Sequence, residues 1–81
     1  MKCSSSTVAF MRACYDREVD AVYITVTEEA EHLPGPVISV PVAVPENMEG
    51  EVVLDFKYGR LIGIEVLGAS ITLPDDLLMS L

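Results

Sequence analysis

The sequence of residues 51–67 is EVVLDFKYGRLIGIEVL. It alternates apolar and polar residues on either side of Tyr58-Gly59, a pair that favours a tight turn between antiparallel strands. With a bulge beside the turn, the alternation gathers six apolar side chains on one face: Val52, Leu54, Phe56, Ile62, Ile64 and Val66. The acidic residues of the stretch fall on the other face. This stretch therefore predicts a β-hairpin with one face suited to a core.

The loop length decides the register of this hairpin. A three-residue loop with Gly59 in the left-handed region pairs Phe56 with Arg60 and separates the two faces as described. A two-residue loop pairs Lys57 with Arg60 and would place Asp55 on the face of the isoleucines. Because a shift of one residue turns a whole strand over, we predict the three-residue loop and its bulge.

Three further segments have the composition of strands. Residues 21–27, AVYITVT, alternate β-branched and aromatic residues and give the strongest β signal of the chain. Residues 8–15 predict another strand, which the acidic loop 16–20 joins to residues 21–27 as a hairpin. Residues 37–44 are apolar enough for another strand. Pro41 has no N–H for a ladder hydrogen bond, so this strand is expected at a sheet edge or a bulge.

The C-terminal residues carry the start signals of a short helix. Thr72 is a candidate cap, Pro74 suits a first turn, and Asp75 and Asp76 favour the positive end of a helix dipole. Before them we expect a turn and a short extended piece. The predicted fold is mainly β, with α+β as the alternative: a small antiparallel sheet of about five strands built from hairpins, with a short C-terminal helix. The 81 residues are expected to form one domain, 1–81, with residues 1–7 as a loose lead-in.

The formal net charge is −8, from 13 acidic and 5 basic residues. No two basic residues are adjacent, which argues against direct nucleic-acid binding, because phosphates are bound by clustered Lys and Arg. The charge also disfavours an anionic membrane surface. The simplest interpretation of the charge is solubility. No stretch has the apolar length of a signal peptide or a membrane span, so a cytoplasmic location is expected.

A chain of this length buries a small core, and small domains are commonly completed by disulfides, a metal or self-association. Cys3 lies in the lead-in, eleven residues before Cys14, and His32 is the one histidine, so no disulfide, metal site or cofactor is expected. Hydrophobic residues make up 51% of the chain, and an apolar edge strand is prone to pairing unless a partner covers it. These features predict a homodimer.

Two separated motifs resemble a known family. They are YDREVDAVYI at residues 15–24 and GRLIGIEVLGAS at residues 59–70, with Val53-Leu54-Asp55 between them. Together they resemble the family catalogued as domain of unknown function 2283, short and mostly bacterial proteins, over roughly residues 10–70. The chain departs from the family pattern in its longer middle, residues 34–50. The resemblance implies no activity, substrate or partner.

Several polar residues are candidates for a functional surface: Asp16, Glu18, Asp20, Asp55, Arg60 and Glu65. The first three alternate like oxygen ligands for a hard cation, but a calcium loop needs more ligands than these. The simpler interpretation is a hairpin loop in which Asp16 accepts backbone N–H groups. Asp55 and Glu65 share a face of the last hairpin without a nucleophile or histidine nearby in sequence, which favours a solvated or interface-facing pair. Arg60 is expected to bridge to a carboxylate, and Cys14 to be a small buried hydrophobe.

Three functional hypotheses follow, the first of which we favour. The chain is a non-catalytic protein-interaction module, acting as a homodimer or as part of a two-protein system. Alternatively, its charge suits an antitoxin-like or regulatory partner of a basic, nucleic-acid-associated protein. The third hypothesis is a carboxylate-based hydrolase or cation-dependent enzyme, which requires that the candidate carboxylates converge in one cleft.

Overall fold

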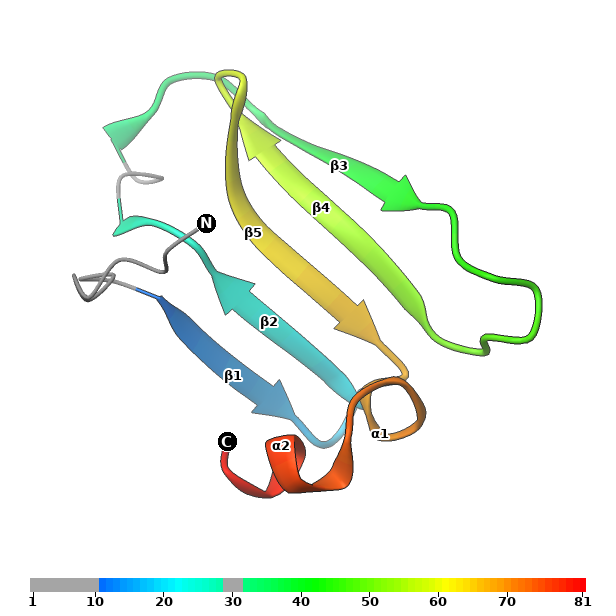
Figure 1. Ribbon diagram of the computed structural model, residues 1–81. Coiled ribbons are helices and arrows are strands. Elements are labelled where there is room, and N and C mark those ends of the chain that lie inside the picture. The colour runs from blue at the N-terminus through cyan, green and yellow to red at the C-terminus, as the bar shows by residue number, and fades with distance from the viewer. Residues whose placement is uncertain (1–10, 29–31) are drawn as a thin grey trace, which may run out of the picture.

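The computed structural model describes residues 11–28 and 32–81, and it confirms the predicted mainly β fold. One antiparallel sheet has the strand order β1-β2-β5-β4-β3 (Figure 1). Its strands are β1 Arg12–Asp16, β2 Ala21–Thr25, β3 Val37–Val42, β4 Glu51–Lys57 and β5 Arg60–Leu67. The last hairpin thus supplies the central strand, β5, which joins the first hairpin to the rest of the sheet. The part of the predicted first strand that precedes residue 11 lies outside the described residues.

The predicted loop of the last hairpin is wrong, although its bulge exists. The loop has two residues, because Lys57 pairs with Arg60, and both Tyr58 (φ 53°) and Gly59 (φ 72°) adopt positive φ. The register then shifts between Asp55 and Phe56, so that Ile62 is the extra residue in β5. The bulge therefore lies within the strands instead of beside the turn. It restores the alternation that the two-residue loop alone would have inverted.

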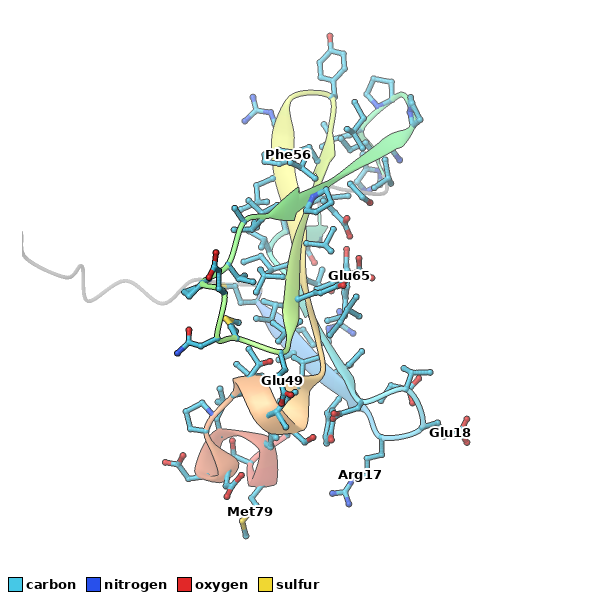
Figure 2. The ribbon with its side chains drawn as sticks, turned by 90° about the vertical axis from the view of Figure 1, so that its right-hand side faces the viewer. Arg17, Glu18, Glu49, Phe56, Glu65 and Met79 are labelled. Carbon is cyan, nitrogen blue, oxygen red and sulfur yellow. The ribbon has the colours of Figure 1, made fainter. Side chains whose placement is uncertain are left out.

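The register gives the sheet one apolar face and one mixed, more polar face. Val52 lies opposite Val66 and Leu54 opposite Ile64, as the predicted separation of faces requires. Continued through all five strands, the same rows and the bulged Ile62 define the apolar face: Ala13, Tyr15, Val22, Ile24, Ile38, Val40, Val42, Val52, Leu54, Phe56, Leu61, Ile62, Ile64 and Val66. The polar face holds the alternate residues, among them Tyr23, Ser39, Asp55, Gly63 and Glu65. In Figure 2 the sheet is seen along its edge, with Phe56 and Glu65 toward opposite sides.

Two short helices, α1 Ala69–Thr72 and α2 Asp75–Met79, cover one end of the apolar face (Figures 1 and 2). The expected helix is present as α2, with Asp75 and Asp76 in its first turn. The extended piece before it is wrong, because those residues form α1. Thr72 is not the cap: Pro74 occupies that position without a side-chain hydrogen bond, and the Thr72 hydroxyl donates to the Gly68 carbonyl at 2.8 Å.

The core lies where these helices meet the sheet. Ala69 and Leu78 from the helices pack with Val22 and Val66 from the central strands, and all four are buried. Half-buried residues of the first hairpin and Leu73 surround them. The described helices include none that is long and apolar enough to cross a membrane.

The strand β3 lies at the opposite edge of the sheet from β1, as Pro41 predicted. All six of its residues are exposed. Its apolar side chains continue the apolar face, yet the core helices pack on the first hairpin and β5 instead. Among residues 11–28 and 32–81, the helices therefore cover one end of the apolar face and leave the β3 end exposed.

Candidate functional site

A hydrogen-bonded cluster ties the first hairpin to the start of α1. Asp20 ends the β1–β2 turn with a positive φ of 51°. Its Oδ1 accepts from the Tyr15 hydroxyl at 2.7 Å and from the Ser70 N–H at 3.0 Å, and its Oδ2 accepts from the Ser70 hydroxyl at 2.7 Å. The Asp20 carbonyl accepts the Ala69 N–H at 2.9 Å. One residue thus binds two segments that are 50 positions apart in the sequence.

These contacts shift two pKa values in opposite directions. The hydrogen bonds from Tyr15 and Ser70 stabilise the charged form of Asp20 and lower its pKa below 3.8. The hydrogen bond to Asp20, with partial desolvation, raises the pKa of Tyr15 above 10.0. At neutral pH the carboxylate is therefore an acceptor and the phenol a donor, which is the pairing that holds the turn.

A second set of contacts crosses the polar face. Asp55 in β4 is buried, 5% exposed, and its Oδ1 accepts from the Ser39 hydroxyl of β3 at 2.7 Å. Tyr23 of β2 reaches toward it over Gly63, where an added Cβ would overlap the Tyr23 phenol. Burial raises the pKa of Tyr23 above 10.0, and the charge of Asp55 and a hydrogen bond with it add to this effect. The contacts span β2 to β3 and brace the sheet across its width.

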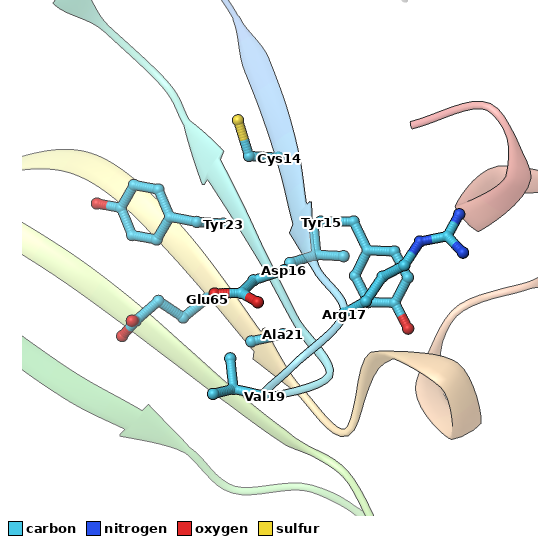
Figure 3. Close-up of a pocket in the computed structure, with 9 residues that line it drawn as sticks. Cys14, Tyr15, Asp16, Arg17, Val19, Ala21, Tyr23 and Glu65 are labelled. Carbon is cyan, nitrogen blue, oxygen red and sulfur yellow. The ribbon is translucent and has the colours of Figure 1, made fainter.

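A shallow hollow of about 470 Å³ lies beside this brace, at the β1–β2 end of the polar face (Figure 3). Tyr23 and Cys14 line it from adjacent strands, and Asp16 and Glu65 contribute carboxylates. Figure 3 shows Tyr23, Glu65 and Asp16 gathered on one side of the hairpin, with Arg17 beside the Tyr15 ring on the other. The Arg17 guanidinium is 5.9 Å from the centre of that ring. The hollow thus combines an aromatic wall with two acidic groups and one basic side chain, Arg17, at its margin.

The predicted site residues are distributed over several places. Asp16 accepts the Glu18 N–H at 3.0 Å, as the simple hairpin interpretation expected, and Glu18 projects from the turn (Figure 2). Asp20 belongs to the cluster with Ser70, while Asp55 is enclosed by the brace. Asp16 and Glu65 are brought together at the hollow, and Arg60 is exposed in the β4–β5 turn.

The candidate carboxylates thus do not meet in the single cleft that the enzyme hypothesis requires. Within residues 11–28 and 32–81, no three acidic, histidine or cysteine side chains are grouped to hold a metal ion. The prediction for Cys14 is wrong: the thiol is exposed, because position 14 alternates onto the polar face. The carboxylates of Asp20 and Asp55 accept hydrogen bonds from hydroxyl groups of other segments of the chain. Both residues therefore position these segments relative to one another.

Three polar side chains that matter in these contacts were not predicted from the sequence: Ser39, Ser70 and the hydroxyl of Tyr23. Ser70 was visible as the last residue of the second motif, since its pattern ends in Ala-Ser. The signal for Tyr23 was the tyrosine in the first motif. Ser39 gave no signal, because its partner Asp55 is 16 residues away on another strand.

The cluster and the brace include residues of both sequence motifs, and a family model spans both motifs. The family model described as protein of unknown function (DUF2283) matches residues 13–70. The match covers more than half of the chain, which therefore belongs to this family. No curated protein and no solved structure matches the chain.

The open end of the apolar face is the other candidate functional surface. We call it the uncovered patch and define it by five residues of β3 and β4: Ile38, Val40, Val42, Leu54 and Phe56. Its β3 members are 59%, 43% and 38% exposed in chain order, and its β4 members are half-buried. Cross-strand pairing places Ile38 opposite Phe56 and Val40 opposite Leu54, so the patch is continuous. None of its side chains carries a charge.

Proposed function

We propose that the protein is a non-catalytic protein-interaction module whose uncovered patch docks a protein partner. One observation carries the proposal: Ile38, Val40 and Val42 continue the apolar face but remain 38–59% exposed. A sheet with one apolar face is stabilised when a second layer covers that face. Here the helices supply this layer over the first hairpin, and neither of the described helices covers the β3–β4 end. Contiguous exposed apolar surface of this kind marks interaction sites in soluble proteins.

The positional role of the polar contacts supports the same conclusion. Asp20 and Asp55 join distant segments, so they hold the sheet that presents the patch. Among the described residues, no buried side-chain nitrogen or oxygen lacks a hydrogen-bond partner. On the polar face the buried polar groups of the described residues thus have hydrogen-bond partners, whereas the uncovered patch on the apolar face is exposed.

Site-specific photocrosslinking tests the proposal. A photoreactive amino acid is placed at Ile38, in the uncovered patch, or at Val37, which is 52% exposed on the polar face of the same strand. In cells that produce these variants, the probe at position 38 should give a discrete crosslinked species, and the probe at position 37 should not. Equal labelling from both positions, or none from either, would contradict docking on this face.

The hollow gives specific support to the second candidate function, an antitoxin-like or regulatory complex with a basic, nucleic-acid-associated protein. Asp16 and Glu65 lie beside the Tyr23 ring, which together suit a lysine or arginine side chain of such a partner. The net charge of −8 would speed association with it. Binding through this surface should weaken as salt is raised and should be reduced by Glu65→Gln. A complex that is insensitive to both would exclude it.

A further inference from the structure

We infer that the uncovered patch is occupied by a second copy of this chain, packed face to face across a twofold axis; this inference rests on the proposed function. The other possible occupant, a different protein, becomes an outcome of the test below.

The distribution of charge favours a second copy on the apolar face. Each side chain assigned to this face is uncharged at neutral pH, whereas the polar face carries four acidic and three basic side chains: Asp16, Glu51, Asp55, Glu65, Arg12, Lys57 and Arg60. Two copies of a chain with a net charge of −8 repel one another, and this repulsion is weakest where the surfaces in contact carry no charge. Two apolar faces meet without opposing charges. An isologous interface also uses the same patch twice, so a single uncovered surface is sufficient for both partners.

Pro41 favours packing of faces over pairing of edges. It is the fifth of the six residues of the edge strand β3 and lies opposite Val53 of β4. Because proline is tolerated in an edge strand where its missing N–H faces outward, it removes a donor that an added strand would need. A second β3 strand therefore pairs poorly with this edge. Sheet faces can still pack at about 10 Å from one another, since this contact uses side chains alone.

The exposed β3 side chains of the patch supply part of such an interface. The exposed fractions of Ile38, Val40 and Val42 correspond to roughly 250 Å² of the about 800 Å² that each partner contributes to a standard interface. Leu54 and Phe56 extend the same surface toward the centre of the sheet. The helices lie at the other end of the face, so they leave room for a partner sheet over β3 and β4 (Figure 1). Val40, between Ile38 and Val42, is the central residue of the exposed row.

The experiment compares two valine substitutions in the same strand. Val40→Glu places a charge in the uncovered patch, and Val37→Glu places the same charge on the polar face, where Val37 pairs with Lys57. The positions have similar exposure, 43% and 52%. Sedimentation equilibrium of the full chain should give a mass of twice 8.8 kDa for the wild type. Val40→Glu should raise the dissociation constant at least about 100-fold, and Val37→Glu less than about 3-fold.

Thermal unfolding at several protein concentrations keeps the inference testable if Val40→Glu does not fold. The unfolding midpoint of a dimer rises with protein concentration, so the wild type should show this rise. A monomeric mass with a constant midpoint would overturn the second copy as occupant. If the position-38 crosslink then joins a different protein, the interaction module stands and only the homodimer fails. If no crosslink forms either, both fail.

Discussion

The phenol of Tyr23 lies across Gly63, so a side chain from β2 fills the space beside the backbone of β5. This contact requires glycine at position 63, because any Cβ there would overlap the Tyr23 ring and its hydroxyl. The contact also brings the hydroxyl within reach of Asp55. The second glycine of the GRLIG motif is therefore explained by packing against the tyrosine of the first motif.

Gly63→Ala should lower the free energy of unfolding by about 1–3 kcal/mol, because the added methyl displaces the Tyr23 ring. Urea denaturation at fixed protein concentration measures the change. The control is the same substitution in a Tyr23→Ala background, where the ring is gone. There Gly63→Ala should cost much less, and additive effects of the two substitutions would contradict the contact.

Asp20 should contribute to stability in an acid-sensitive way. Its pKa is lowered in the folded protein, so its contribution is present above 3.8 and is lost as the pH falls through the lower folded value. Asp20→Asn should reduce stability at neutral pH and flatten the dependence of the unfolding free energy on pH in this acid range. Glu46→Gln, which makes the same charge change in an exposed turn, is the control. An unchanged acid profile in Asp20→Asn would show that the cluster has no such role.

Val22 is the centre of the small core, with 1% of its surface exposed. Val22→Ala should destabilise the protein by about 2 kcal/mol, through lost apolar burial and the cavity that remains. Val19→Ala removes the same atoms from a side chain that is 66% exposed, and it should change stability by less than about 0.5 kcal/mol. Chemical denaturation measures both. Similar losses at the two positions would mean that the core is misplaced.

The turn residue Tyr58 has a positive φ although its side chain is 70% exposed. Asparagine adopts this conformation more readily, and Asn-Gly is a favoured pair in two-residue hairpin turns. Tyr58→Asn should therefore raise the free energy of unfolding by about 0.5 kcal/mol. Tyr58→Ala removes the ring without relieving the backbone and serves as the control. Equal stabilisation by both would point to the ring instead of the backbone.

Alternation along the chain was sufficient to predict most of the strands and their hairpins, and Pro41 predicted the edge position of β3. It could not predict the loop of the last hairpin, because Gly59 allows both loop lengths and tyrosine rarely adopts positive φ. The separation of faces survived this error, since the bulge at Ile62 corrects the register further along the strands. Alternation thus constrains which residues share a face more strongly than it constrains the position of the irregularity.

The polar contacts were less accessible from the sequence. Asp16 was correctly interpreted because its acceptor contact is local, two residues away. Asp20 accepts a hydrogen bond from Ser70, which is 50 residues away in the sequence. The first residue of α1 is held in the same way, because the Ala69 N–H donates to the Asp20 carbonyl. Four residues have little helical preference of their own, so α1 is determined by tertiary contacts. The sequence predicted only that β3 is an apolar edge strand. It did not predict which part of the apolar face the C-terminal helices cover, because this depends on tertiary contacts.

The central position of β5 has a consequence for the time at which the sheet can be completed during synthesis. The β1–β2 hairpin is made before its partner in the sheet, β5, which is translated about forty residues later. Until Leu67 has left the ribosome, neither β2 nor β4 has its central neighbour, and the two halves of the sheet have no strand in common. The sheet can therefore be completed only after β5 has been synthesised, because this strand joins the two halves.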